Sequence, residues 1–266
     1  MKCLITGANG FIGKSLVKKL LLNSDSYIYA LVTSKIDLED ITSDRLKCIE
    51  MTFDSYDKIF EEIGDDVDVV FHLAWKGLCG PAAKDLDTQL ENVSATSKLL
   101  AQAKLMHAKK VILASSMNTL EVREFLNHPN ITKPRTVYTH VAAKLTSEII
   151  SRVFCADNSI EFNVALLAMV YGENNKSKMI PNVFIYSLLN GIKPKLITGN
   201  NLYDLVYIDD VVEGMIAIAN KGINNKTYYI GHEEIKPFKD LFLEIKNIIN
   251  PNIEIQFGAY PEDNAI

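Results

Sequence analysis

Three glycines, Gly7, Gly10 and Gly13, stand close together between a short apolar run and a helical pattern. The first glycine lets a chain turn sharply out of a strand, and the second lets backbone N–H groups approach a bound anion. The third lets the next helix pack against a sheet with its positive end aimed at that anion. The spacing therefore predicts a loop that binds the pyrophosphate of a dinucleotide. The alternative is a tight βα turn that binds nothing, at a needless entropic cost.

The end of the second apolar run carries another signal, because a dinucleotide site reads the adenosine ribose there. An acid at that point selects NAD, whereas hydroxyls and a cation accommodate the 2′-phosphate of NADP. The run ends in Thr33, Ser34 and Lys35, and the first acid, Asp37, comes later. We therefore expect NADP to be the preferred cofactor, with NAD possible. An ordinary polar loop with a solvated lysine is the alternative.

Four more residues are candidates for contact with the cofactor. Asn9, Phe11 and Ile12 belong to the glycine loop and the start of the helix that follows it. Asp54 follows the third apolar run, where a loop beside the adenine would lie, although it could equally cap the next helix.

Apolar runs alternate with helical patterns through the first two thirds of the chain. That alternation predicts an α/β fold, a doubly wound parallel sheet of the Rossmann type with helices on both faces. The expected strands are 2–6, 27–32, 46–51, 68–74, 110–115 and 160–167. The expected helices are 11–22, 55–63, 84–107 and 138–156.

After about residue 170 the alternation loosens, and Gly, Asn and Pro become frequent. Helices are expected at 178–190, 209–220 and 237–249, among short strands near 195–198, 203–207, 227–230 and 253–257. We interpret 1–168 as a dinucleotide-binding domain and 169–266 as a smaller α/β lobe that binds the substrate.

Composition narrows the function classes. The chain has 266 residues, 48% of them apolar, and a formal charge of −5, which argues against nucleic-acid and membrane partners. No apolar run approaches the length of a membrane span, and the first strand begins at the amino end, so no signal peptide is expected. The four cysteines form no CxxC pair. We therefore expect reduced thiols, no metal site and a cytoplasmic location.

Further motifs follow in order, each beside an expected element. They are His72-Leu73-Ala74, Asn92, the pair Ser115 and Ser116, Lys144 with Glu148 one turn later, Val170-Tyr171-Gly172, and the stretch from Asp204 to Asp210. With the glycine loop they resemble the extended short-chain dehydrogenase/reductase family, the NAD-dependent epimerase/dehydratase branch that modifies nucleotide-linked sugars. Each motif alone is common, but the set is specific and covers nearly the whole chain.

The resemblance implies roles for individual residues. Leu73, Ala74 and Asn92 would line the cofactor, Ser116 would bond a substrate carbonyl, and Lys144 would hold the nicotinamide ribose. Ser116 also ends a parallel strand, where such sheets bind their ligands. The alternatives are a serine that caps the strand end and a lysine whose charge reaches solvent.

One departure bears on catalysis. The family's pair is Tyr-x-x-x-Lys on one helical face, but the residue four before Lys144 is His140. Tyr138 is six residues away and should not share that face. His140 would then be the proton donor, or Tyr138 would reach in from the helix start, or the protein would bind cofactor without catalysis.

Three milder departures concern the substrate. Leu166 and Leu167 stand where the family has an Arg-Pro pair, and Tyr203 stands where it has an arginine, which should weaken or reshape nucleotide-sugar binding. Relatives usually continue beyond the point matching Ile266, so the lobe is either minimal or truncated.

The helices 84–107 and 138–156 form a two-fold dimer in relatives, so a homodimer is expected.

The reaction is narrowed by comparison with the family's chemistries. Sugar 4,6-dehydratases carry an acidic pair directly after the serine, but Met117 and Asn118 follow Ser116 here. Sugar 4-epimerases need the tyrosine as both base and acid. We therefore predict NADPH-dependent reduction of a nucleotide-linked 4-keto-6-deoxy sugar, with Ser116, Lys144 and His140 or Tyr138 as the catalytic group. The alternatives are a nucleotide-sugar 4-epimerase and a non-catalytic dinucleotide-binding protein.

Overall fold

A seven-stranded parallel sheet organises the larger part of the molecule, as the alternating pattern predicts. The computed structural model describes residues 1–23, 25–128 and 138–260. Across the sheet the strand order is β10-β6-β5-β4-β1-β2-β3. The bounds are β1 Lys2–Thr6, β2 Tyr27–Val32, β3 Leu46–Glu50, β4 Val69–His72, β5 Lys110–Ser116, β6 Glu161–Leu167 and β10 Thr227–Ile230. The order reverses between β1 and β4, and open α/β sheets bind ligands at such a point.

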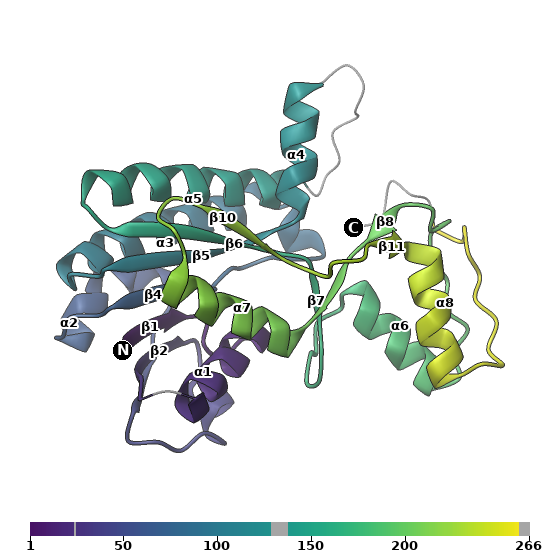
Figure 1. The fold of residues 1–266 in the computed structure, drawn as a ribbon, viewed down its shortest axis with the longest axis horizontal. Coiled ribbons are helices and arrows are strands. Elements are labelled where there is room, and N and C mark those ends of the chain that lie inside the picture. Colours follow the sequence, from purple (N-terminus) through teal and green to yellow (C-terminus); the bar gives the residue numbers. More distant parts are fainter. Residues whose placement is uncertain (24, 129–137, 261–266) are drawn as a thin grey trace. The chain divides into compact units, whose positions relative to one another are not determined.

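Helices cover both faces of this sheet (Figure 1). On one face lie α3, Leu86–Leu105, and α5, Tyr138–Asp157; on the other lie α1, Phe11–Asn23, and α7, Ile208–Lys221. All four residues of β4 are buried, as a strand covered on both faces requires. The short helices η1 Lys35–Leu38, η2 Phe53–Lys58, α2 Ile59–Ile63 and η3 Pro81–Ala83 lie in the connections.

One helix was not expected from the sequence. Helix α4, Asn118–Asn127, directly follows β5. Its side chains Val122 and Phe125 pack against Val141 and Leu145 of α5. The apolar pattern is short, so packing against α5 stabilises this helix more than its own periodicity does.

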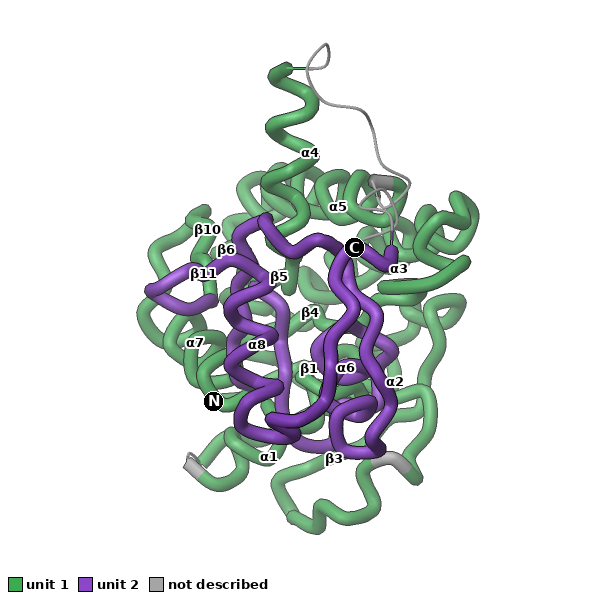
Figure 2. The backbone as a smooth tube through the Cα atoms, turned by 90° about the vertical axis from the view of Figure 1, so that its right-hand side faces the viewer, with its two compact units in different colours: residues 1–167, 208–230 green, residues 168–207, 231–266 purple. Residues whose placement is uncertain are grey.

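The described chain divides into two compact units (Figure 2). The first comprises residues 1–167 and 208–230, and the second comprises 168–207 and 231–266. The sequence boundary assigned everything from 169 onward to the smaller lobe, so residues 208–230 are a correction. They belong with the larger unit because β10 extends the sheet beside β6 and α7 packs on α1, where Lys19 pairs with Glu213 at 2.6 Å.

The second unit has a small aromatic core. Phe184, Phe238 and Phe242 are buried in it, and the last two rings stack at 4.0 Å. The elements of this unit are β7 Met169–Tyr171, α6 Ile180–Leu189, β8 Leu202–Tyr203, β9 Leu205–Tyr207, β11 Lys236–Pro237 and α8 Phe238–Ile249. The strands expected near 195–198 and 253–257 reduce to a single bridge between Lys195 and Gln256. None of the helices in the described ranges is both long and apolar enough to cross a bilayer.

The apolar stripe on α5 runs from the core to the surface. Val141 is fully buried and Leu145 is half-buried, whereas Ile149 and Val153 are 61% and 58% exposed. A four-residue spacing drifts around a helix of 3.6 residues per turn, which explains the change of environment. Two exposed aliphatic side chains suit an interface, but homodimer formation stays a prediction.

Lys110 fastens α7 to the sheet. Its side chain is buried beside β6, and its Nζ donates to the carbonyl oxygens of Ala219 and Gly222 at 3.1 and 3.2 Å. It also pairs with Glu161 at 3.0 Å. The last carbonyls of a helix have no partner within the helix, so this cation both bonds them and meets the negative end of the helix dipole.

We expect Lys110→Met to lower the free energy of unfolding by about 1–3 kcal/mol, because it leaves buried carbonyl groups without a donor. Urea unfolding followed by circular dichroism measures the change. Lys109→Met is the matched control, since Lys109 is exposed and holds only a surface pair with Asp68. Equal effects of the two substitutions would contradict the assignment.

Candidate functional site

The glycine loop has the backbone geometry that a phosphate site requires. Gly7 has a φ of +68°, and a Cβ built there would lie 2.8 Å from the Cα and N of Ala74. A Cβ on Gly13 would lie 2.2 Å from the Gly7 carbonyl oxygen. Because both positions exclude a side chain, the loop can bring backbone to the carboxyl end of β1.

The start of α1 presents donors at this loop. The Lys14 N–H bonds the Gly10 carbonyl at 2.8 Å, which begins the helical ladder. The N–H groups of the preceding turn, on Phe11, Ile12 and Gly13, precede that ladder and are available to an anion. The Gly10 N–H, by contrast, donates to the Gly7 carbonyl at 2.9 Å, so it closes the turn and is not available to an anion.

A buried hydrogen-bond chain joins the ends of β1 and β4. The Thr6 hydroxyl accepts from the N–H groups of Leu73 and Ala74 at 3.2 and 3.1 Å. It lies 2.8 Å from His72 Nδ1, and His72 Nε2 lies 2.9 Å from the Thr96 hydroxyl. Leu73 and Ala74, predicted cofactor contacts, are thus held against the glycine loop.

His72 is neutral in this chain. The Thr96 hydroxyl donates its proton to the Asn92 carbonyl at 2.9 Å, so it accepts from His72 Nε2–H, and Nδ1 accepts from Thr6. Burial, together with the positive charge of Lys144, lowers the pKa of His72 to about 3. His72 therefore positions the strand ends and does not exchange protons near neutral pH.

The loop after β4 is held from α3. Asn92, predicted to contact the cofactor, is buried, and its side chain accepts from the Lys76 N–H at 2.7 Å and donates to the Lys76 carbonyl at 3.0 Å. Gln89 is fully buried and accepts from the Trp75 indole N–H at 3.0 Å. Both side-chain amides are hydrogen-bonded to the loop after β4. Asn92 would therefore affect a cofactor indirectly, by holding that loop in place.

The end of β2 brings together the predicted ribose-reading residues. Asn9 donates to the Thr33 hydroxyl at 2.9 Å, which links this end to the glycine loop. Ser34 is half-buried and Lys35 is exposed. Glu50, at the end of β3, accepts from the Lys35 N–H at 3.4 Å and brings a carboxylate to the same place. The sequence prediction did not include that acid.

Asp54 lies in the first turn of η2 and is exposed. The N-cap of that helix is Thr52, so Asp54 does not cap it. Lys98 of α3 donates to the Asp54 carbonyl at 3.0 Å, which fixes the backbone and leaves the carboxylate directed to the surface.

Lys144 is the strongest single feature of the site. It lies on α5, is 6% exposed, and its Nζ donates to the Ala114 carbonyl of β5 at 3.3 Å. The same Nζ lies 4.0 Å from the centroid of the Trp75 ring. Burial lowers the pKa of Lys144 from 10.5 to about 7. A buried ammonium with one long hydrogen bond has donors to spare for a ligand.

Ser116 ends β5, two residues beyond the carbonyl that Lys144 reaches. Its hydroxyl accepts from the Asn118 N–H at 3.3 Å, and its carbonyl accepts from the Thr119 hydroxyl at 2.9 Å. The hydroxyl proton stays available, because both of these bonds use oxygen lone pairs.

His140 lies one turn before Lys144 on α5 and is buried, with 3% of its surface exposed. The spacing of four places the two side chains on one helical face. Helix α5 begins at Tyr138, six residues before the lysine. The side chain of Tyr138 lies outside the described residues.

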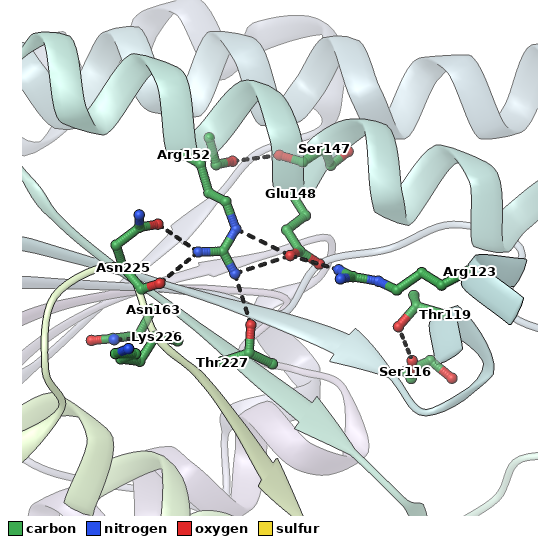
Figure 3. Close-up of polar contacts among 11 residues, drawn as sticks. Ser116, Thr119, Arg123, Ser147, Glu148, Arg152, Asn163, Asn225, Lys226 and Thr227 are labelled. Carbon is green, nitrogen blue, oxygen red and sulfur yellow. Dashed lines mark hydrogen bonds and ion pairs between the residues drawn. The ribbon is translucent and has the colours of Figure 1, made fainter. Parts of the chain in front are cut away.

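Glu148, one turn after Lys144, anchors the neighbouring helix. Its carboxylate is buried, and one oxygen accepts from Arg123 of α4 at 2.9 Å and from Arg152 of α5 at 3.0 Å. Figure 3 shows the two guanidinium groups approaching Glu148 from opposite sides, with Arg152 also bonded to Asn225 and Thr227. This pairing connects α4, which starts beside Ser116, to the helix that carries Lys144 and His140.

A separate pocket of about 410 Å³ lies within the second unit. Its walls are mostly apolar and include Ile185, Leu241 and Ile245, and Tyr203 also lines it. The Tyr203 ring packs edge-on against Phe238 at 5.2 Å. Tyr203 therefore replaces the family's arginine with a core aromatic, as the sequence departure indicates.

The structure thus assembles two clusters at the carboxyl edge of the sheet. The glycine loop, Thr33 and Ala74 lie around β1, and Lys144 reaches β5 close to Ser116. Sequence reasoning missed Trp75, Gln89 and the two arginines on Glu148. Trp75 directly follows the His72-Leu73-Ala74 motif, and that adjacency was the available signal.

These residues fit a nicotinamide dinucleotide. The first N–H groups of α1 match a pyrophosphate, and the buried ammonium of Lys144 has donors for the ribose hydroxyls. The first group follows β1, and the second lies against Ala114 of β5 and Trp75, which follows β4. Such cofactors usually bind at the carboxyl edge where the strand order reverses, here between β1 and β4.

Comparisons with known proteins bear on the identity of the chain. The model of the NAD dependent epimerase/dehydratase family matches residues 3–231. CapI of Staphylococcus aureus is 25% identical over an alignment of 235 residues, and the match covers 83% of this chain and 70% of that protein.

Two solved structures share the fold. The UDP-N-acetylglucosamine 4-epimerase of Methanobrevibacter ruminantium, in complex with UDP-N-acetylmuramic acid, has a TM-score of 0.81 at 22% identity and covers 99% of this chain and 87% of its own. DesIV, a dTDP-glucose 4,6-dehydratase of Streptomyces venezuelae with NAD and TYD bound, has a TM-score of 0.83 at 18% identity. The match covers 100% of this chain and 86% of the DesIV chain.

We expect Lys144→Met to raise the midpoint of thermal unfolding by several degrees, because it removes a buried charge whose pKa is lowered to about 7. Below that pKa both folded and unfolded lysine are protonated, so the burial penalty is complete. Between about pH 7 and pH 10.5 the unfolded state binds more protons, so wild-type stability rises and the advantage of the variant shrinks. The gain should be large near pH 6 and small near pH 10.

Lys110→Met is the matched control for this measurement, because Lys110 is also buried but has several oxygen partners. We expect it to lose stability at both pH values. A gain for Lys144→Met that did not change with pH would contradict the assignment of a depressed pKa.

Proposed function

Because the chain belongs to the NAD-dependent epimerase/dehydratase family, we propose that it is a nicotinamide-dependent oxidoreductase of a nucleotide-linked sugar. The family match covers residues 3–231, which include every residue of both clusters. The neighbouring structures are named as a nucleotide-sugar 4-epimerase and a 4,6-dehydratase, which supports this substrate class.

The reaction we propose is reduction of a nucleotide-linked 4-keto-6-deoxy sugar. The observation that carries it is the buried His140 one turn from Lys144, in place of the family's tyrosine. Reduction of a ketone needs one proton as the hydride arrives, and an imidazole can deliver one near neutral pH. Elimination of water is disfavoured, because Met117 and Asn118 follow Ser116 where dehydratases of this family carry acids.

Each residue has a distinct part in this proposal. The reduced nicotinamide supplies the hydride when it is bound. Ser116 donates its hydroxyl proton in a hydrogen bond to the carbonyl oxygen, and His140 delivers the proton that completes the alcohol. Lys144 donates to the nicotinamide ribose, and its charge stabilises negative charge that develops nearby.

A second candidate is a nucleotide-sugar 4-epimerase that retains NAD. Two observations favour it: the epimerase among the structural neighbours, and the carboxylate of Glu50 beside Lys35. A carboxylate at the ribose end suits a 2′-hydroxyl better than a 2′-phosphate. Against it, Thr33 and the exposed Lys35 suit the phosphate, so we retain NADP as the proposed cofactor.

Calorimetry with NADP⁺ and NAD⁺ tests the cofactor. We expect NADP⁺ to bind more tightly, and Lys35→Ala to weaken NADP⁺ by about tenfold while leaving NAD⁺ nearly unchanged, because a phosphate loses one charged partner. Glu50→Gln is the companion variant and should strengthen NADP⁺. Tighter binding of NAD⁺ to the wild type would favour the epimerase, and no binding of either would remove the proposal.

Turnover of NADPH with nucleotide-linked 4-keto-6-deoxy sugars tests the reaction. We expect activity to fall as pH rises through the ionisation of His140. We expect His140→Phe to lower kcat about 100-fold or more, the usual contribution of a general acid, with coenzyme affinity maintained.

Tyr138→Phe is the comparison variant for the donor. A loss of kcat in that variant and not in His140→Phe would assign the proton to Tyr138. Coenzyme binding without turnover of any nucleotide-linked sugar, by reduction or by epimerisation, would indicate a binding protein. In that case His140→Tyr, which restores the family's residue, is the variant that would recover activity.

A further inference from the structure

Trp75 is the chain's single tryptophan and lies at the carboxyl edge of the sheet, directly after Ala74. Its indole N–H donates to Gln89 Oε1 at 3.0 Å, so the ring is fixed at its polar edge. The face of the ring, unlike its N–H edge, is electron-rich.

Gln89 is a rigid anchor for this ring. It is fully buried on α3, and its Nε2 donates to the carbonyls of Gly77 and Ala82 at 3.0 and 2.9 Å. Since both ends of the amide are bonded, neither the amide nor the indole can turn without breaking buried hydrogen bonds. The orientation of Trp75 is therefore part of the fold and not one of several surface rotamers.

The ring faces the Lys144 ammonium. Nζ lies 4.0 Å from the ring centroid, well inside the range of a cation–π contact. Within the described residues, its one hydrogen bond is to the Ala114 carbonyl at 3.3 Å, and a carboxylate does not pair with it. The buried charge thus has a carbonyl on one side and an aromatic face on another.

We propose that Trp75 is the positioning residue for Lys144: the indole, fixed by Gln89, keeps the buried side chain in its charged form and directs it toward the cofactor's ribose. The ring stabilises the ammonium, as a carboxylate does at other buried lysines, but it neither neutralises the charge nor uses one of the N–H donors. Trp75 touches Lys144 and acts through it.

The charged form matters for the function proposed above, on which this inference rests. An ammonium has three donors and a positive charge, whereas a neutral amine has two donors, one acceptor lone pair and no charge. Burial lowers the pKa of Lys144 to about 7. A ring that favours the cation therefore moves the lysine toward the state that can hold a ribose diol at neutral pH.

Within the part of the chain that the structure describes, β4 and α5 supply other titratable groups near Lys144. From β4, His72 is buried and neutral with a pKa lowered to about 3, so it does not titrate in the same range. From α5, His140 lies one turn before Lys144, and Glu148 lies one turn after and is paired with Arg123 and Arg152. The elements β5 and α3 contribute the Ala114 carbonyl and the uncharged Gln89.

The test uses the cofactor-free full chain, labelled with ¹³Cε-lysine and titrated by NMR. The Lys144 signal is the one that disappears in Lys144→Met. We expect Trp75→Leu to lower the titration midpoint of Lys144 by about one pH unit, the size of a buried cation–π contact, and Trp75→Phe to lower it less. The same titration of His140→Phe identifies any part of the Lys144 titration curve that is caused by ionisation of the imidazole.

The wild type alone gives a second measurement. The ε-protons of Lys144 should be shifted upfield by the ring current of Trp75. A Lys144 signal at the ordinary lysine position would overturn the proposal, even if the leucine variant failed to fold. An unchanged or raised midpoint in Trp75→Leu would overturn it as well.

These outcomes are separate from the fate of the proposed function, because neither measurement contains a coenzyme or a sugar. Titration with NADP⁺ then connects the two. We expect Trp75→Leu to weaken coenzyme binding several-fold at about pH 8 and much less at about pH 5, where Lys144 is mostly protonated in both proteins. Equal weakening at both pH values would assign Trp75 a packing role only and overturn the proposal.

Discussion

The close approach of β1 and β4 is the constraint on which the rest of the site depends. At Gly7 the backbone comes so near Ala74 that a Cβ would lie 2.8 Å from its Cα. The Thr6 hydroxyl ties the same two strand ends through two backbone N–H groups. This contact sets where α1 begins and where the loop carrying Trp75 leaves the sheet. Both halves of the site follow from it.

The two buried lysines differ in how many polar partners stabilise their charge. Lys110 is surrounded by helix carbonyls and Glu161, and serves to hold α7 against the sheet. Lys144 is equally buried but has one long hydrogen bond and an aromatic ring. Burial of such a charge costs stability, which agrees with the proposal that Lys144 serves a ligand at the carboxyl edge of the sheet.

The departures from the family fall on charged and proton-transferring positions, while the backbone positions are retained. The glycine loop keeps its geometry, but the tyrosine of the catalytic pair is His140 and an arginine is Tyr203, now packed on Phe238. Elsewhere, Arg123 and Arg152 share the buried Glu148. The backbone of the glycine loop therefore keeps the family's form, and the departures lie in the side chains at the edge of the sheet.

The sequence by itself determined the parallel sheet, its main helices and the place of the glycine loop. Those features depend on local periodicity and on glycines whose backbone requirement is visible residue by residue. Tertiary structure alone decided the rest. Helix α4 depends on packing against α5, and residues 208–230 join the larger unit through strand pairing with β6. Trp75 meets Lys144 across a separation of 69 positions, and Glu50 reaches Lys35 from a neighbouring strand. Such contacts join residues far apart in the chain, and a local sequence pattern does not predict which distant residues will meet.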